Sequence, residues 1–349
     1  MVPDSVYGAI MRSLGVLSWF HRHRHGLVLC FHSVTASDSE AVNFGRMAIR
    51  GEFLERMIVD LRRRGIALVS LSEALKLATA SPQPFIALTF DDGYRDNYEI
   101  AYPILKKFDV PFTIFVTTGL IDRTLPMWWH VLEDVIDRNV FIEYEGVTLA
   151  SSTKRAKAVA YRLISEYFRH LDQRNVISAT DALIAKNDSR LTRADAFDQA
   201  LDWDMIREMA GSGLATFGGH TVSHPLLRQL DRASLVAEIG DCRHRLREAG
   251  GIKPAYFAYP FGQDKEVGAL APAVTEEAGF TAAFTTHARV LRSHDLQHPF
   301  RLPRVMLSRK AQNEWIVRAY HSGLPAMIRE LWPRHEPSRT APQLDQSDR

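Results

Sequence analysis

Apolar and polar positions along this 349-residue chain fall into two recurring patterns. Short apolar runs bounded by polar residues or glycine predict buried strands, and longer segments with apolar positions three or four apart predict helices. The predicted strands are 27–31, 66–70, 85–90, 112–116, 214–217, 255–259 and 281–285. The predicted helices include 53–64, 97–108, 204–210 and 234–248. This alternation predicts an α/β fold built on a parallel sheet with right-handed crossovers.

The segment 121–200 interrupts the alternation of strands and helices. A connection of this length rarely lacks structure of its own. Its spacing predicts a helix over 128–138, a hairpin over 140–149 and a second helix over 154–169. We interpret the segment as an inserted, mainly helical subdomain over the rim of the sheet.

The two ends of the chain have patterns of their own. Residues 7–20 form an apolar, helix-compatible stretch, and alternating His and Arg follow it at 21–25. Packing against the main domain is the favoured prediction, because most amphipathic helices cover a core. Weak peripheral membrane contact stays open as an alternative, since apolar burial and attraction to anionic lipid act together. A last helix is predicted after residue 309, and the polar tail 333–349 is predicted to be disordered.

Composition narrows the classes of function. Lys and Arg number 43 against 41 for Asp and Glu, so no overall positive field attracts nucleic acid. Two cysteines, Cys30 and Cys242, are too few for a disulfide framework, which favours a reducing compartment. The N-terminus lacks the pattern of a signal peptide, and no apolar run reaches the length of a membrane span. We therefore expect a cytoplasmic protein without a nucleic-acid partner.

Candidate chemistry appears where the strand 85–90 ends, because Asp91 and Asp92 follow it directly. Like charges a few ångströms apart disfavour joint ionisation, so two adjacent carboxylates need separate tasks. A cation resolves the conflict. One Asp can bind the cation while the other, kept ionised by the same charge, takes a proton from bound water.

A second motif contains His220 and His224, with Pro225 directly after the second histidine. The proline disfavours the α conformation at His224, so we expect both imidazoles on a loop at a strand end rather than on a helix face. Together with one Asp they form the set of three protein ligands typical of catalytic zinc, with a position left open for water. A pair of histidines at this spacing is weak evidence alone, but it gains weight beside the two carboxylates.

The two motifs, joined by Phe-Ala-Tyr-Pro-Phe-Gly at 257–262, resemble the NodB-homology polysaccharide deacetylases of carbohydrate esterase family 4. Further similar segments lie at 31–34, 202–203 and 302–305, and the resemblance covers roughly residues 27–120 and 200–307. Parallel barrels gather their chemistry at the carboxyl ends of the strands, where these motifs fall. The resemblance implies a distorted, incomplete (β/α) barrel with about seven strands.

The resemblance also implies roles for individual residues. Asp91 would be the general base, and Asp92, His220 and His224 would hold one divalent metal, with zinc favoured. The backbone N–H of Phe261 would donate to the developing oxyanion. The neighbouring Tyr259 and Pro260 would contact the substrate.

Two departures from the family pattern concern the partners of the base. Ala258 stands where the family has an arginine, so we expect Arg304 to replace it, because a guanidinium gives a carboxylate both charge and bidentate geometry. The family's late general-acid histidine corresponds by motif to His294. Other candidates for that acid stay open, and they are His32, His287 and His298.

These expectations divide the chain into an N-terminal helical extension (1–25), the NodB-homology barrel (26–120 and 201–307), the inserted subdomain (121–200), a C-terminal helix (308–332) and the tail (333–349). Trp128 and Trp129 of the insert are candidate substrate-stacking residues, although most such aromatics belong to a core.

The predicted function is metal-dependent removal of N-acetyl groups from amino sugars of a poly- or oligosaccharide, which breaks a linear amide C–N bond. The partner is therefore an N-acetylated glycan. One alternative is hydrolysis of a non-sugar amide on the same fold. Another is a carbohydrate-binding protein with a degenerate site, although pure binding does not require a base and three ligands together.

Overall fold

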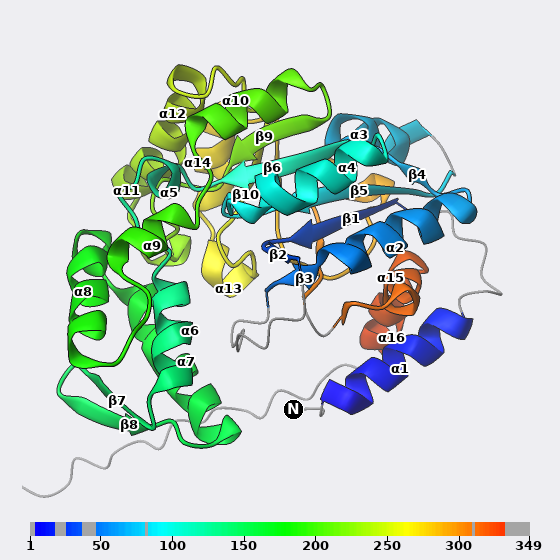
Figure 1. The fold of residues 1–349 in the computed structure, drawn as a ribbon. Coiled ribbons are helices and arrows are strands. Elements are labelled where there is room, and N and C mark those ends of the chain that lie inside the picture. The colour runs from blue at the N-terminus through cyan, green and yellow to red at the C-terminus, as the bar shows by residue number, and fades with distance from the viewer. Residues whose placement is uncertain (1–3, 18–25, 37–46, 81–82, 309–310, 332–349) are drawn as a thin grey trace, which may run out of the picture.

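The structure is a computed structural model that describes residues 4–17, 26–36, 47–80, 83–308 and 311–331 (Figure 1). The His and Arg run at 21–25 and the tail 333–349 lie outside these residues.

The centre of the fold is an eight-stranded parallel sheet. Its strands β1 and β5 are buried at every residue, which is the pattern expected when helices or side chains cover both faces. The strands are β1 (Gly26–Phe31), β4 (Ala67–Leu68), β5 (Phe85–Phe90), β6 (Phe112–Val116), β9 (Ala215–Gly219), β10 (Tyr256–Ala258), β11 (Ala282–Phe284) and β12 (Val305–Met306).

Seven of these strands follow one path in the order β11-β10-β9-β6-β5-β1-β12, and β4 pairs with β5 beside it. The two ends of the path approach each other, because an isolated parallel bridge joins Phe284 of β11 to Leu302, just before β12. The sheet therefore curls into the distorted, incomplete barrel that the sequence predicts. Parallel pairing places the carboxyl ends of the strands along one rim, with Phe31 of β1 opposite Phe90 of β5.

Helices follow the strands and cover the outside of the sheet (Figure 1). Predicted segments such as 97–108 and 234–248 are helical but include a π-helical turn. The helical elements of the barrel are α2 (Gly51–Arg63), α3 (Leu71–Ala80), η2 (Asn97–Ala101), α4 (Tyr102–Lys107), α5 (Thr118–Ile121), α10 (Trp203–Gly211), η4 (Leu227–Gln229), α11 (Arg232–Val236), η5 (Ala237–Asp241), α12 (Cys242–Glu248), α13 (Asp264–Val267), α14 (Ala271–Glu277), η6 (Ser293–Gln297) and η7 (Pro299–Arg301). A small parallel pair, β2 (Val34–Thr35) and β3 (Ile49–Arg50), follows β1.

The insert forms a mainly helical lobe at one side of the barrel (Figure 1). Its apolar residues, among them Ile136 and Ile164, belong to the same hydrophobic cluster as strands β5 and β6, so the insert packs on the barrel core. Two of its helices, α8 and α9, were not predicted. The elements of the insert are α6 (Trp128–Arg138), the antiparallel hairpin β7 (Phe141–Tyr144) and β8 (Val147–Ala150), α7 (Lys154–His170), η3 (Gln173–Asn175), α8 (Val176–Lys186) and α9 (Arg193–Asp198).

Helices from the two ends of the chain pack on each other. The N-terminal helix α1 (Asp4–Leu17) lies against α15 (Glu314–His321), where a Cβ at Gly15 would come within 2.2 Å of the Trp315 carbonyl oxygen. The single C-terminal helix that the sequence predicts is two helices, because Gly323, with a φ of 76°, ends one before α16 (Leu324–Leu331) begins. None of the helices in the described ranges has the length and apolar character needed to cross a membrane.

Candidate active site

A pocket of about 470 Å³ opens at the rim where the strands end, a volume typical of small-ligand sites. One wall comes from the barrel and the other from helices α6 and α7 of the insert. The residues that line it are His32, Ser33, Met47, Asp91, Asp92, Tyr94, Trp128, Trp129, His130, Glu133, Tyr161, Ser165, Arg169, His220, His224, Phe261, Gln263, Glu266, Thr286 and Met306.

Asp91 and Asp92 lie side by side at the end of β5 and are 2% and 5% exposed. The Asp91 N–H continues the strand pairing by donating to the Phe31 carbonyl at 2.9 Å. Asp92, in contrast, has a φ of 72°, a conformation that is costly for a residue with a Cβ and that concentrates at functional sites. The reversal of the backbone between them gives each carboxylate its own set of partners.

Arg304 is the partner of Asp91. Its guanidinium, at the start of β12, donates through Nη1 to Oδ1 at 2.7 Å and through Nη2 to Oδ2 at 2.8 Å. The guanidinium is fixed in turn, since it also donates to Thr89 Oγ1 at 3.1 Å and to the Thr285 carbonyl at 3.3 Å. Arg304 is fully buried and does not line the pocket, so it acts on the pocket through Asp91.

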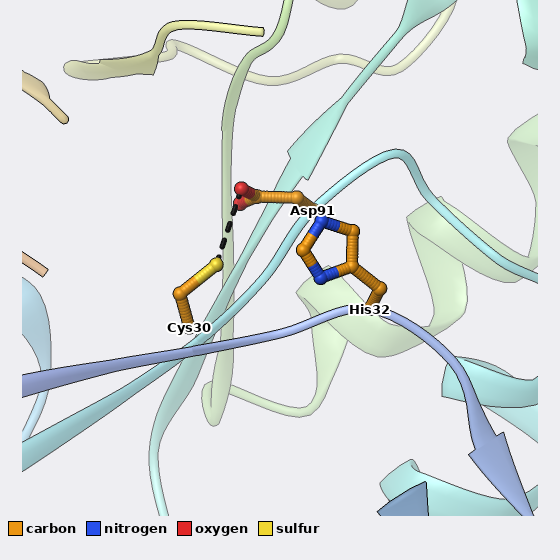
Figure 2. A group of neighbouring side chains, drawn as sticks. All are labelled: Cys30, His32 and Asp91. Atoms are coloured by element: carbon orange, nitrogen blue, oxygen red, sulfur yellow. Dashed lines mark hydrogen bonds between the residues drawn. The ribbon is translucent and has the colours of Figure 1, made fainter. Parts of the chain in front are cut away.

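Cys30 and His32 of the β1 end also approach Asp91 (Figure 2). The Cys30 thiol donates to Asp91 Oδ2 at 3.2 Å. The three residues have the donor types of a metal site, but burial raises the pKa of the thiol well above its ordinary value, and metals bind the thiolate. Arg304 already supplies the positive charge that Asp91 requires. We therefore interpret Cys30 as a hydrogen-bonded support for Asp91 and do not assign a second metal centre to this cluster.

Asp92, His220 and His224 offer ligand atoms that all lie within 4.8 Å of one another. Asp92 Oδ1 is 3.5 Å from His220 Nε2 and 3.3 Å from His224 Nε2. Ligands at about 2.0–2.1 Å in a tetrahedral zinc site are separated by about 3.3–3.4 Å, so the observed spacing fits such an ion. Asp92 Oδ1 is also buried and, in the described part of the chain, has no hydrogen-bond partner. A buried carboxylate oxygen without a hydrogen-bond donor is suited to bind a cation.

Both histidines lie on the loop that follows β9, as expected from Pro225, and each is oriented by the backbone. His220 Nδ1 bonds the Ala258 carbonyl at 2.7 Å, so it carries the proton and leaves the Nε2 lone pair toward Asp92. His224 has a φ of 56°, and its N–H donates to Thr221 Oγ1 at 2.9 Å.

Glu238 of η5 supports the histidine loop, a role that no sequence pattern indicates. Its Oε2 accepts hydrogen bonds from the backbone N–H groups of Val222 at 3.0 Å and Ser223 at 2.9 Å. Its Oε1 accepts a further bond from the Ser223 hydroxyl at 2.5 Å. A carboxylate with these partners fixes the chain between the two imidazoles.

The protonation states follow from burial and from the neighbouring charges. Burial raises the pKa of Asp91, but the Arg304 guanidinium and the His220 ring outweigh it and hold that pKa below its ordinary value. At His220 burial lowers the pKa, yet the two carboxylates raise it above its ordinary value. Burial dominates at His224 and lowers its pKa to about 4, so its ring is neutral at pH 7. The carboxylates thus attract positive charge to the place where the ligand atoms meet.

Phe261 lines the pocket, whereas its neighbours Tyr259 and Pro260 do not. Phe261 has a φ of 62°, and its ring packs edge-on against His224 with centroids 4.7 Å apart. Among the described residues none accepts a hydrogen bond from its backbone N–H. Tyr259 is fully buried, and its hydroxyl donates to the Phe300 carbonyl at 2.9 Å. Contact of Tyr259 and Pro260 with substrate stays a prediction that the pocket wall does not support.

The structure does not bring His294 to the pocket. It lies on η6, its side chain is 61% exposed, and its Nε2 faces Asp295 at 3.4 Å. His287 and His298 are also absent from the pocket wall. His32, the remaining rival, lines the pocket at 9% exposure, and its buried Nδ1 has no hydrogen-bond partner among the described residues. The histidine of the Leu-x-x-His motif thus lies on the surface, and its role as the acid stays a prediction.

The tryptophans of the insert line the pocket, but part of each ring is used in packing. Trp128 stacks on Phe168 with centroids 4.5 Å apart, and Trp129 lies 6.3 Å from the His224 ring. Sequence reasoning missed their neighbour His130, whose pKa burial lowers to about 4. It also missed Arg169, whose side chain crosses from α7 to the barrel loop that bears Phe261.

The sheet curled into an open barrel, with a pocket at the carboxyl ends of its strands, defines an α/β-barrel protein. The model of the polysaccharide deacetylase family matches residues 78–283, which is more than half of the chain. The chain belongs to the polysaccharide deacetylase family. The matched residues include Asp91, Asp92, His220 and His224 but end before Arg304.

Relatives of the chain carry the same family identity. YxkH of Bacillus subtilis, named after this family, is 30% identical over 129 residues, covering 36% of this chain and 41% of the relative. The poly-β-1,6-N-acetyl-D-glucosamine N-deacetylase of Escherichia coli is 23% identical over 148 residues, covering 42% of this chain and 22% of the relative. The chain therefore matches less than half the length of these curated relatives.

A solved structure with a similar fold is IcaB from Ammonifex degensii. It superposes with a TM-score of 0.55 over 85% of this chain and 97% of that chain, at 22% identity. This likeness supports the barrel architecture.

The burial of the ion pair between Asp91 and Arg304 predicts how stability depends on pH. Folding lowers the pKa of Asp91, so the ion pair stabilises the fold at pH values above the pKa of about 3.9 that Asp has in the unfolded chain. This stabilisation is lost as the pH falls through the pKa of Asp91 in the folded protein. Arg304→Met leaves the carboxylate buried and unpaired, so the unfolding free energy should drop by about 3–5 kcal/mol at pH 7. Near pH 4, where the carboxyl can be protonated, the difference should shrink. Denaturant unfolding of chelator-treated protein measures both values.

Arg245→Met is a matched control. Arg245 also makes a bidentate pair, with Asp122, but the two side chains are 43% and 22% exposed. Its loss should cost about 1 kcal/mol or less, because water screens exposed pairs. Equal losses in the two variants, or a loss in Arg304→Met that does not change with pH, would contradict the proposed role of burial.

Proposed function

We propose that the protein is a metal-dependent hydrolase that removes N-acetyl groups from amino sugars of a poly- or oligosaccharide. The observation that carries this proposal is the convergence of two sets of residues in one pocket. Asp91, paired with Arg304, has the features of a base. Beside it, Asp92 and the two histidines have the spacing of a metal site. Family membership supports deacetylation, and the substrate and the metal are part of the proposal.

Asp92, His220 and His224 would hold the divalent cation, and zinc suits a set of two imidazoles and one carboxylate best. When bound, such an ion polarises a carbonyl and lowers the pKa of water. The remaining chemistry belongs to the side chains and backbone groups around the pocket.

Asp91 would act as the general base. Arg304 keeps it ionised and fixes the direction of both oxygens, which matters because a misplacement of about 1 Å can cost on the order of a hundredfold in rate. As the water oxygen bonds to the acetyl carbon, Asp91 takes the water proton. The carbonyl oxygen gains negative charge in this step, and the unpartnered Phe261 N–H would donate to it.

His32 would carry the proton to the leaving amine. A ring nitrogen of His32 lies within 4.8 Å of an Asp91 oxygen, and the residue lines the pocket. Asn97 Nδ2 donates to the backbone carbonyl of His32 at 2.7 Å and so fixes the backbone at this position. Its neutral imidazole would take the proton held by Asp91 at one nitrogen and release a proton from the other to the amine. The C–N bond breaks as the amine nitrogen is protonated, which yields the free amine and acetic acid, and the acid then ionises to acetate in solution.

The walls of the pocket support a sugar as substrate. Trp128, Trp129 and Tyr161 provide aromatic surface, and Ser33, Glu133 and Gln263 provide polar groups for hydroxyls. The name of the Escherichia coli relative states that it acts on poly-β-1,6-N-acetyl-D-glucosamine. A β-linked N-acetylglucosamine polymer or oligomer is therefore the first substrate to test.

Acetate release from N-acetylated oligosaccharides is the direct test of this function. The protein should release acetate, lose activity after treatment with a chelator and regain it with Zn²⁺, because the metal ligands must be loaded for hydrolysis. Release from small non-sugar amides alone would favour the alternative hydrolase. Glycan binding without release would favour a degenerate carbohydrate-binding protein.

The two adjacent carboxylates should respond differently to the same substitution. Asp91→Asn should lower kcat by about a thousandfold or more while zinc binding stays close to that of the wild type, because the base is lost but no ligand is. Asp92→Asn should weaken zinc affinity by about tenfold to a hundredfold, since a neutral amide is a poorer ligand. Zinc titration by calorimetry and steady-state kinetics measure the contrast. Equal loss of metal in the two variants would reject the division of roles.

His32→Gln should lower kcat by about a hundredfold with little change in zinc affinity, because general acid catalysis contributes about that much. His294→Gln is the matched control, since His294 is exposed and does not line the pocket, and its kinetics should equal those of the wild type. The reverse result, with activity lost only in the His294 variant, would return the acid to the position that the family motif indicates.

A further inference from the structure

We infer that Arg169 of the insert is a positioning residue for the catalytic loop 259–266, so that the insert contributes to catalysis as well as to the pocket wall. The inference rests on the proposed function, because the loop contains the N–H of Phe261 that would stabilise the oxyanion. Arg169 acts through the ring of Phe261 and through the carboxylate of Glu266.

Arg169 lies in the last turn of α7 and reaches from the insert to the barrel. The carbon of its guanidinium is 4.1 Å from the centroid of the Phe261 ring, within the range of a cation–π contact. Its Nη2 donates to Glu266 Oε1 at 2.8 Å. Glu266 is 9% exposed, so this ion pair is much better shielded from water than the other contact of Arg169, with Glu166 at 3.4 Å.

The two contacts of Arg169 fall at the two ends of one turn. Phe261 begins the turn with a φ of 62°, which a side chain disfavours and which must be held by its surroundings. Glu266 ends it, and its second oxygen accepts the backbone N–H of Gln263 at 3.1 Å. Thr286 Oγ1 donates to the Phe261 carbonyl at 2.9 Å and fixes the other side of the strained peptide. Arg169 is thus the link from the insert that restrains both the strained residue and the carboxylate that caps the turn.

The Phe261 ring is held between two functional groups. One neighbour is the Arg169 guanidinium, and the other is the His224 imidazole, in a T-shaped arrangement with centroids 4.7 Å apart. Phe261 suits this position without a hydroxyl group, because the Arg169 guanidinium lies over the face of the ring and needs no hydrogen-bond acceptor from it. Loss of Arg169 would free the ring to rotate and, with it, the peptide that carries the N–H.

A double-mutant cycle on kcat tests whether Arg169 acts through Phe261. Arg169→Met keeps the length of the side chain but removes the charge, and Phe261→Leu removes the ring but keeps the backbone N–H. Each single variant should lower kcat about tenfold with KM within about twofold, because a displaced oxyanion donor affects the transition state more than substrate binding. The double variant should be no slower than the slower single variant. The inference would be overturned if the kcat losses of the two single variants multiply in the double variant, or if Arg169→Met leaves kcat unchanged.

Two further variants separate positioning from general stability. Arg169→Lys keeps the charge near Glu266 but loses the planar guanidinium over the ring, so its kcat should fall between those of the wild type and Arg169→Met. If Arg169→Met does not fold, Arg169→Lys takes its place in the double-mutant cycle. Arg174→Met is the matched control from the same insert, because Arg174 pairs with Asp172, is 88% exposed and does not line the pocket. It should leave kcat unchanged, and a tenfold loss there would contradict a specific role of Arg169.

Amide hydrogen exchange provides a readout that does not depend on the substrate. In Arg169→Met, exchange in peptides that cover 259–266 should increase by about tenfold, while peptides of β5 should keep their wild-type rates. If the wild type releases no acetate from any glycan but exchange increases as stated, the proposed function fails and the link between insert and loop stands. If the wild type is active and exchange in the loop does not change, the role of Arg169 is rejected.

Discussion

Two carboxylates from consecutive residues are buried side by side in this protein, and the rest of the site is arranged around that constraint. The backbone reversal at Asp92, with its φ of 72°, gives the two groups different surroundings. Asp91 meets a fixed guanidinium, whereas Asp92 meets two imidazole nitrogens and has no hydrogen-bond donor at its buried oxygen among the described residues. The Arg304 guanidinium gives Asp91 a permanent positive partner, and a cation beside Asp92 would do the same for the second carboxylate. Two separate positive partners would allow both carboxylates to ionise.

The insert gives the barrel a second wall. Strand ends alone would leave the carboxylates at an open rim, but α6 and α7 bring aromatic and charged side chains over it. Because the apolar side of the insert joins the main hydrophobic cluster, the wall is anchored by packing and not only by the ion pair of Arg169. A family of enzymes can vary such a wall and leave the strand ends unchanged, which is how one fold serves several substrates.

The sequence predicted the parts of this structure that depend on local patterns. Apolar runs such as 85–90 and 112–116 coincide with β5 and β6 because strands buried on both faces leave a continuous apolar signal. Arg304 was predicted from chemistry, as the replacement for a missing arginine. Glu238 and Arg169 were not predicted, because their partners lie far away in the chain and neither has a local signal. Tyr259 and His294 do not line the pocket, since a motif gives the identity of a residue but not the direction of its side chain.

Arg304 reaches Asp91 across 213 positions of the chain, from the strand that completes the sheet. During synthesis the carboxylate therefore emerges long before its cation, and a partly folded barrel cannot bury Asp91 in its ionised form without a large cost. Closing so distant a pair also makes the contact order high, which favours slow folding. Asp91 therefore gains its fixed partner only when almost the whole barrel has formed.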